Sequence, residues 1–147
     1  MNVAQHILVV EDSDDDFATV LDAARRAGVA HPIRRASSGD DGLRLLRESL
    51  HAPGGLPALV LLDLNTPKGD GRDALLAIHK DDNLRALPLV VLSTSSNPRD
   101  LAFCYACGAN AYHVKPLQHG AHLKVLEQLF AYWLTQVILP SSQGAAR

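Results

Sequence analysis

The chain has 147 residues, of which 47% are hydrophobic and 20% are charged, a composition and length that suit one globular domain with a full core. This composition excludes a largely disordered chain, and a formal net charge of −2 gives no general attraction to nucleic acid. The chain has no apolar stretch of 18 residues and begins with an acidic cluster in place of a basic leader, so we expect a cytoplasmic protein without membrane contact.

Short apolar runs alternate with amphipathic segments along the whole chain. In chain order we expect a strand at 6–10, a helix at about 13–27, a strand at 32–36, a helix at about 38–50, a strand at 58–63, a helix at about 70–79, a strand at 88–93, a helix at about 98–107, a strand at 111–114 and a helix at about 120–138. This alternation predicts an α/β fold, a flavodoxin-like doubly wound sheet of five parallel strands in the order 2-1-3-4-5 with five helices. The domain would span 1–139, and the Ser/Gly/Ala-rich tail at 140–147 would be disordered.

The strand at 58–63 is an unbroken apolar run that ends at a single carboxylate, Asp63. A run this short and apolar is typical of a parallel strand buried on both faces. The strand at 6–10 ends in the same way, at Glu11 and Asp12. The predicted strand order makes these two strands neighbours, so the three carboxylates should converge at the carboxyl edge of the sheet, where open α/β sheets bind ligands.

Carboxylates crowded at one edge repel one another, and a divalent cation with oxygen ligands relieves that repulsion. Mg²⁺ fits best because it binds through one or two carboxylates and keeps waters available for a phosphate. Lys115 follows the fifth strand and Ser93 ends the fourth, which places both on the same rim. The set predicts phosphoryl transfer to a nucleophilic carboxylate, with a metal and two donors to the phosphoryl oxygens.

Taken in order, these residues resemble the receiver domain of two-component response regulators, over about residues 5–138. The resemblance implies that Glu11 and Asp12 are the acidic pair that helps to hold Mg²⁺. It implies that Asp63 is the phosphoacceptor and that Asn65 lends its backbone carbonyl to the metal.

Three further positions match the residues by which that family stabilises the phosphoryl group and changes conformation in response to it. Ser93 stands at the switch Ser/Thr position, Tyr112 at the aromatic switch position, and Lys115–Pro116 at the Lys-Pro pair, where the family has a cis peptide. A closer resemblance is to the stand-alone response regulators of bacterial and cyanobacterial phytochromes. The segments that carry it are Val-Glu-Asp-Ser-Asp-Asp-Asp at 10–16, Pro-Lys-Gly-Asp-Gly-Arg at 67–72, Val-Leu-Ser-Thr-Ser at 91–95 and the ending at 132–140.

The mechanism implied by the resemblance is transfer of a phosphoryl group from a sensor histidine kinase, here a phytochrome-type kinase, to Asp63. The protein would be a signalling protein and not an enzyme, with only self-phosphotransfer and autodephosphorylation. Ser93 would be drawn toward the phosphoryl group and Tyr112 would turn inward, which changes the face formed by the fourth helix, the fifth strand and the fifth helix. Because no effector domain is expected, output would be phosphorylation-dependent protein binding or a change of dimer.

The apolar residues of the last helix cover an arc of roughly 180°, wider than the ~100° stripe that packing on one sheet requires. Four of them, Leu126, Phe130, Trp133 and Val137, continue a 3-4-3-4 spacing that suits helix pairing in a homodimer. We expect these residues to form the dimer interface. The alternative is a large core helix with one exposed edge.

Three other interpretations compete with these predictions. A phosphatase of the haloacid dehalogenase kind also uses an aspartate at a strand end, but Asn65 stands where that family needs its general acid. A receiver fold that binds partners without being phosphorylated is a further alternative. Cys104 and Cys107 could form half of a zinc site or a redox pair, although two thiols three residues apart on a helix are more simply packing residues.

Overall fold

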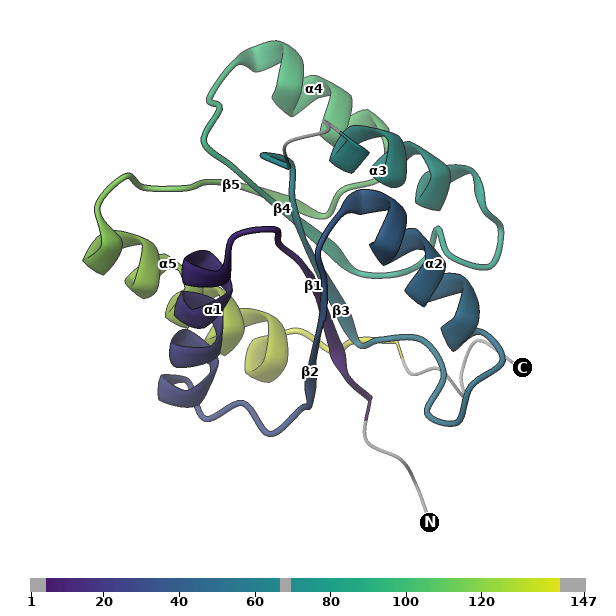
Figure 1. Ribbon diagram of the computed structural model, residues 1–147, viewed down its shortest axis with the longest axis horizontal. Helices are drawn as coiled ribbons and strands as arrows, with labels where there is room; N and C mark the ends of the chain where they lie inside the picture. Colours follow the sequence, from purple (N-terminus) through teal and green to yellow (C-terminus); the bar gives the residue numbers. More distant parts are fainter. Residues whose placement is uncertain (1–4, 67–69, 141–147) are drawn as a thin grey trace.

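The structure, a computed structural model, describes residues 5–66 and 70–140 and contains one sheet of five parallel strands (Figure 1). In chain order the strands are β1 (Ile7–Val10), β2 (Ile33–Ala36), β3 (Leu59–Asp63), β4 (Leu89–Ser93) and β5 (Ala111–Val114). They lie in the order β2-β1-β3-β4-β5, so the predicted flavodoxin-like topology is confirmed. Most of the tail expected to be disordered, 141–147, lies outside the described residues.

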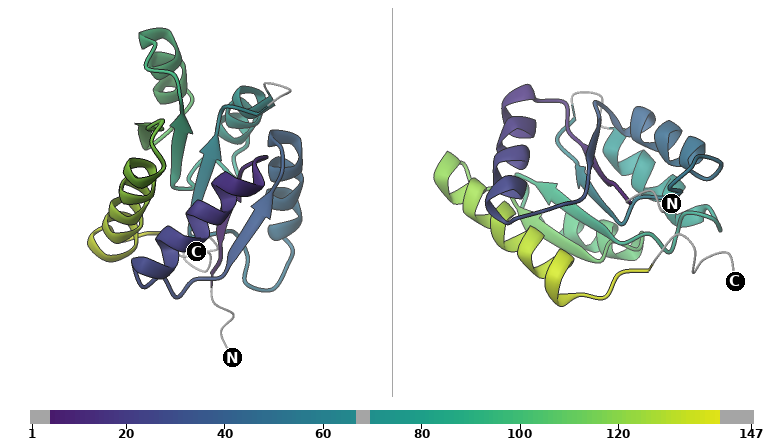
Figure 2. Two further views of the ribbon diagram at one scale, coloured as in Figure 1. Left: turned by 60° about the vertical axis from the view of Figure 1, so that its left-hand side comes forward. Right: turned by 90° about the horizontal axis from the view of Figure 1, so that it is seen from below.

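Helices alternate with the strands and cover both faces of the sheet. In the described part of the chain they are α1 (Asp14–Arg26), α2 (Gly39–Ser49), α3 (Asp70–Lys80), α4 (Pro98–Ala106) and α5 (His119–Ala131), followed by a π-helical turn, η1 (Tyr132–Gln136). Figures 1 and 2 show α1 and α5 on one face, with α2, α3 and α4 on the other. Right-handed crossovers between parallel strands produce this two-sided cover. None of the described helices has the length and apolar character needed to cross a membrane.

The central strands β1, β3 and β4 are apolar except at the last residues of β3 and β4, because each of them has a helical layer on both sides. In β1, Leu8 and Val10 belong to the core beneath α2, α3 and α4, whereas Ile7 and Val9 belong to the core beneath α1 and α5. All five residues of β3 and of β4 are likewise buried, but β5 at the edge of the sheet is only partly buried. The unbroken apolar run at 58–63 therefore reflects a strand covered on both faces.

Side-chain caps fix where several helices begin. The Ser13 hydroxyl accepts a hydrogen bond from the Asp16 N–H at the start of α1, and the Ser38 hydroxyl accepts one from the Asp41 N–H at the start of α2. Pro98 occupies the first turn of α4, as the sequence predicted. Ser13 as cap sets the first turn of α1 immediately after β1, next to the carboxyl edge of the sheet.

Helix α5 corrects one prediction about the dimer interface. Leu126 and Phe130 are both fully buried and belong to the core beneath α1 and α5, so they are not available to a second molecule. The wide apolar arc has a local cause, because α5 packs on the sheet and also along α1. Of the four residues predicted for the interface, only Trp133 and Val137 keep part of their surface exposed.

Both cysteines are core residues. Cys104 and Cys107 are buried, unbonded to each other, and lie in the core cluster beneath α2, α3 and α4. Burial raises the pKa of the Cys104 thiol to about 11, which keeps this side chain a neutral apolar group. The interpretation as packing residues is confirmed for this pair.

Gly39 lies where the first turn of α2 meets the start of α3. A Cβ atom at position 39 would overlap the backbone carbonyl of Asp70 and lie 2.7 Å from its carbonyl carbon. We therefore expect Gly39→Ala to lower the free energy of unfolding by about 1–3 kcal/mol, measured by urea denaturation. Gly120→Ala is the matched control, since a Cβ there meets nothing within 4 Å and should change stability by at most about 1 kcal/mol, as a gain. Equal effects at both positions would contradict the steric argument.

Candidate phosphoryl-acceptor and metal site

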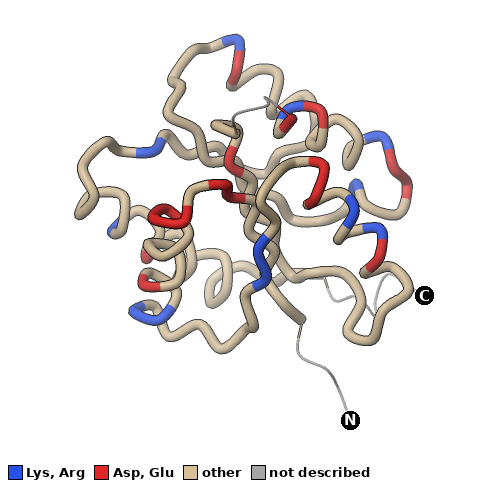
Figure 3. The backbone as a smooth tube through the Cα atoms, in the orientation of Figure 1, with Lys and Arg blue, Asp and Glu red and all other residues tan. Residues whose placement is uncertain are grey.

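Four strand ends bring the predicted site residues to one edge of the sheet. Asp63 pairs with Leu92, the residue before Ser93, and Glu11 directly follows β1 beside β3. Figure 3 shows the acidic segments at the ends of β1 and β3 and at the start of α1 gathered at this edge. Lys115 follows β5, and its backbone N–H donates to the Ser93 carbonyl at 2.7 Å. The topology therefore assembles a site from residues more than 100 positions apart.

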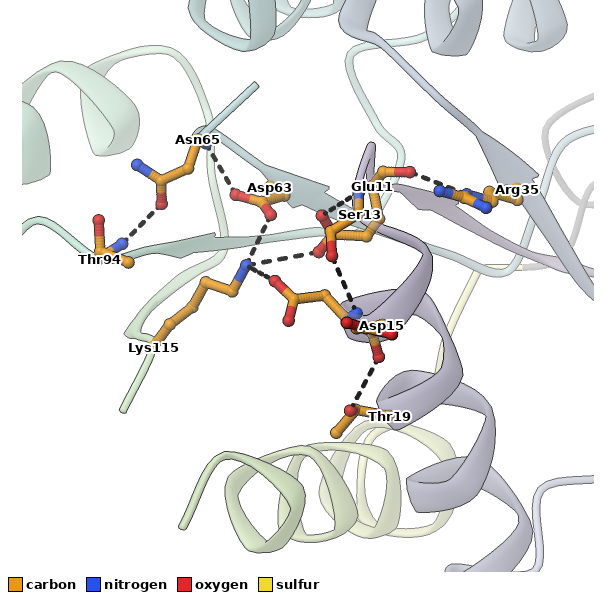
Figure 4. Close-up of polar contacts among 10 residues, drawn as sticks. Glu11, Ser13, Asp15, Thr19, Arg35, Asp63, Asn65, Thr94 and Lys115 are labelled. Carbon is orange, nitrogen blue, oxygen red and sulfur yellow. Dashed lines mark hydrogen bonds and ion pairs between the residues drawn. The ribbon is translucent and has the colours of Figure 1, made fainter. Parts of the chain in front are cut away.

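The ammonium group of Lys115 lies at the centre of this site (Figure 4). It donates to Asp63 Oδ2 at 2.7 Å and to Asp16 Oδ2 at 2.9 Å, and it lies 3.4 Å from Glu11 Oε1. The side chain of Lys115 is only 8% exposed. Burial alone would lower the pKa of Lys115, but its hydrogen bonds to Asp63 and Asp16 outweigh burial and raise the pKa above its ordinary value. The site therefore holds a permanent cation.

Glu11 is as deeply buried as Asp63, with 2% of its surface exposed. Burial, and then the neighbouring Asp63 carboxylate, raise the pKa of Glu11 to about 8, against the opposing effect of Lys115. The Ser13 N–H donates to Glu11 Oε2 at 3.2 Å, and Arg35 Nε donates to the Glu11 carbonyl at 2.9 Å. These contacts fix the loop between β1 and α1. Because its pKa is raised, the Glu11 carboxyl group gives up its proton only near neutral pH or above.

Three carboxylate oxygens, one each from Glu11, Asp16 and Asp63, lie within 4.8 Å of one another. Such oxygen donors are the ligands that hard divalent cations prefer, so these residues fit a divalent metal. Asp12 does not belong to this group of three and is half-buried beside it. Sequence reasoning missed Asp16, whose position three residues after the Ser13 cap was the available signal.

Asn65 links the end of β3 to the residue that follows β4. Its backbone N–H donates to Asp63 Oδ1 at 2.7 Å, and its side-chain oxygen accepts from the Thr94 N–H at 2.7 Å. These bonds orient the Asp63 carboxylate, whose other oxygen accepts a hydrogen bond from the Lys115 ammonium group. The loop that continues from here includes 67–69, part of the predicted 67–72 segment, which lies outside the described residues.

Ser93 and Tyr112, the two predicted switch residues, meet at Ser95. The Ser95 N–H donates to the Ser93 hydroxyl at 3.1 Å, and the Tyr112 hydroxyl donates to the Ser95 carbonyl at 2.8 Å. Ser93 is buried, and its hydroxyl keeps its own hydrogen for another acceptor. The Lys115–Pro116 peptide is trans, whereas the resemblance implied a cis bond. The trans isomer is the lower in energy for most X-Pro bonds, by about 0.5–1 kcal/mol.

Comparisons with known proteins agree with this geometry. The sequence profile of the response regulator receiver domain matches residues 7–127. The "Probable methanogenesis regulatory protein FilR2" of Methanothrix harundinacea is 39% identical over 130 residues, which cover 87% of this chain and 83% of FilR2.

Solved structures of similar proteins have the same fold. Response regulator Rcp1 of Synechocystis sp. is 33% identical over 96% of this chain and 97% of its own length. Its Mn²⁺-bound structure covers 93% of this chain and 99% of that one, with a TM-score of 0.85. The phosphorylated cyanobacterial phytochrome response regulator RcpA also has a TM-score of 0.85, at 33% identity, and covers 95% of this chain and all of its own.

Proposed function

This chain belongs to the response regulator receiver domain family, whose members are signalling proteins, and from that premise we propose that it accepts a phosphoryl group on Asp63. The observation that carries the proposal is the contact between Lys115 Nζ and Asp63 Oδ2 at 2.7 Å within a buried, acidic site. A buried aspartate at a strand end needs a partner for its charge, and the same ammonium group can pair with a phosphoryl oxygen. The donor would be a phosphohistidine of a sensor histidine kinase.

The chemistry assigns one task to each residue. One Asp63 oxygen forms the new bond to phosphorus while the phosphorus–nitrogen bond of the phosphohistidine breaks and the imidazole keeps the electron pair. Lys115 stabilises the charge on the phosphoryl oxygens. The Ser93 hydroxyl donates its own hydrogen to a phosphoryl oxygen, and its movement toward that oxygen shifts the Ser95 loop that also holds Tyr112.

We assign a Mg²⁺ site to Glu11, Asp12, Asp63 and the Asn65 backbone carbonyl. Support for a divalent metal comes from the crowded carboxylates and from the Mn²⁺ bound to Rcp1. When bound, the ion neutralises negative charge on the carboxylates and the incoming phosphoryl group. The residues of the chain provide hard oxygen donors, a choice that favours Mg²⁺ or Mn²⁺ over metals that prefer sulfur or imidazole.

The kinase partner is proposed to be a phytochrome-type histidine kinase. RcpA is a phytochrome response regulator, and it is similar to this chain over the full length of RcpA. Because the likeness covers 95% of this chain, it includes surfaces beyond the site itself. A phytochrome kinase would make phosphorylation of Asp63 respond to light.

Intact mass after incubation with Mg²⁺ and acetyl phosphate tests the phosphoacceptor. We expect one phosphoryl adduct on the wild type and none on Asp63→Asn. Asp73→Asn, an exposed position on α3, is the matched control and should keep the adduct. A folded wild type that binds Mg²⁺ but acquires no adduct from acetyl phosphate or from a phosphorylated kinase would favour a phosphorylation-independent interaction module.

A homodimer through α4, β5 and α5 is the proposed output. The large exposed apolar and aromatic side chains on or beside these elements are Tyr105, Val114, Leu117, Tyr132 and Ile138. We expect Val114→Asp to weaken dimerisation of the phosphorylated protein at least about tenfold, measured by analytical ultracentrifugation. Leu21→Asp on α1, at similar exposure, is the control and should leave the dimer intact. A monomer both before and after phosphorylation of the wild type would contradict the proposal.

A further inference from the structure

Lys115 has two close carboxylate partners, and only one of them is the proposed phosphoacceptor. Its ammonium nitrogen lies 2.7 Å from Asp63 Oδ2 and 2.9 Å from Asp16 Oδ2. The two acids come from different elements, since Asp63 ends β3 and Asp16 lies in the first turn of α1. The ammonium group therefore bridges the sheet and a helix across the site.

The surroundings of the two carboxylates differ. The Asp63 side chain is 2% exposed and its other oxygen is already bonded to the Asn65 N–H, whereas the Asp16 side chain is 38% exposed. The backbone N–H of Asp16 is held by the Ser13 hydroxyl, and the start of a helix favours a negative charge. Asp16 is thus a carboxylate fixed in place at the mouth of the site, while Asp63 lies at its base.

Phosphorylation requires Lys115 to change partners. The Lys115 side chain is 8% exposed, so its ammonium group cannot pass into bulk water when the Asp63 oxygen is taken up in bonding to phosphorus. A phosphoryl oxygen can replace Asp63 as its partner, and a second anion keeps the ammonium group in position during that change. The one at hydrogen-bonding distance that the proposed chemistry does not otherwise use is Asp16.

We propose that Asp16 is a positioning residue for Lys115, holding its ammonium group beside the phosphoryl group while Asp63 reacts. This inference rests on the proposed phosphoryl transfer to Asp63. In this inference Asp16 acts through Lys115 and the metal is held by the other carboxylates, although an Asp16 oxygen lies within 4.8 Å of theirs. Its loss therefore lowers the rate of phosphorylation at saturating Mg²⁺ and leaves Mg²⁺ affinity nearly unchanged.

The first test compares Asp16→Asn with Asp15→Asn. The second variant removes the same charge from the same helical turn at an exposed position, so it reports the effect of charge alone. At saturating Mg²⁺ we expect Asp16→Asn to slow phosphorylation by acetyl phosphate about tenfold and Asp15→Asn by less than about twofold. Mg²⁺ dissociation constants from calorimetry should change less than about threefold in both. A loss of Mg²⁺ affinity of about tenfold or more in Asp16→Asn alone would make Asp16 a metal ligand and overturn the inference.

A double-mutant cycle with Lys115→Met provides the second test. If Asp16 acts through Lys115, Asp16→Asn causes no further loss of rate in the Lys115→Met background. A tenfold loss that persists in that background overturns the inference. Absence of any adduct on the wild type would instead refute the proposed phosphoacceptor, so the two failures are distinguishable. Thermal unfolding of each variant confirms that the compared proteins are folded.

Discussion

Lys115→Met is expected to slow phosphorylation of Asp63 about a hundredfold and, at a pH where Glu11 is ionised, to tighten the binding of Mg²⁺. The two effects have opposite signs for one physical reason. Lys115 is the cation that balances Glu11, Asp16 and Asp63 within the site. Without it the carboxylates are left with unbalanced charge, which Mg²⁺ relieves, but no ammonium group remains to stabilise the phosphoryl oxygens.

Rates from intact mass at saturating Mg²⁺ and dissociation constants from calorimetry at about pH 9 measure the two effects separately. Lys124→Met is the matched control, since Lys124 is exposed on α5 and its loss removes the same charge. It should alter both quantities less than about twofold. Weaker Mg²⁺ binding in Lys115→Met at that pH would show that Lys115 supports the metal site and does not compete with it.

The fold and the base of the site are the parts that sequence alone could predict. Residues 58–62 are uniformly apolar because β3 is covered on both faces, and this pattern identified the strand that ends at Asp63. The flavodoxin-like strand order then places Glu11 and Lys115 beside that carboxylate. Long-range proximity was predictable here because parallel strands end at a common edge.

Asp16 was not predictable in the same way. It stands in a run of three aspartates at the start of a helix, a pattern that ordinary capping explains. Only the structure shows that Asp16, and neither of the other two aspartates, accepts a hydrogen bond from the Lys115 ammonium group. The periodicity of the fifth helix misled for a related reason, since Leu126 and Phe130 serve a core shared between the sheet and α1. A sequence gives the width of an apolar arc but not the number of surfaces that cover it.

Mg²⁺ binding is expected to strengthen as the pH rises from about 6 to about 8, because Glu11 must lose its proton to serve the metal. Burial and the Asp63 carboxylate raise the pKa of Glu11 to about 8, so each pH unit below that value should weaken Mg²⁺ binding by up to about tenfold. Glu11→Gln should bind Mg²⁺ more weakly at pH 8 and lose most of this dependence. Glu48→Gln, at an exposed position on α2, should keep it.

The raised pKa of Glu11 makes the metal-free protein less stable as the pH rises, whereas Mg²⁺ binding becomes stronger. Because the folded state raises the pKa of Glu11, it binds the proton more tightly than the unfolded chain. This contribution to the free energy of unfolding is complete below 4.5, the ordinary pKa of a glutamate side chain, and is lost as the pH rises through about 8. Urea denaturation without metal should therefore show a loss of stability across this window in the wild type that Glu11→Gln lacks, and saturating Mg²⁺ should offset it. An identical pH slope in both proteins, with and without Mg²⁺, would assign the proton to another group.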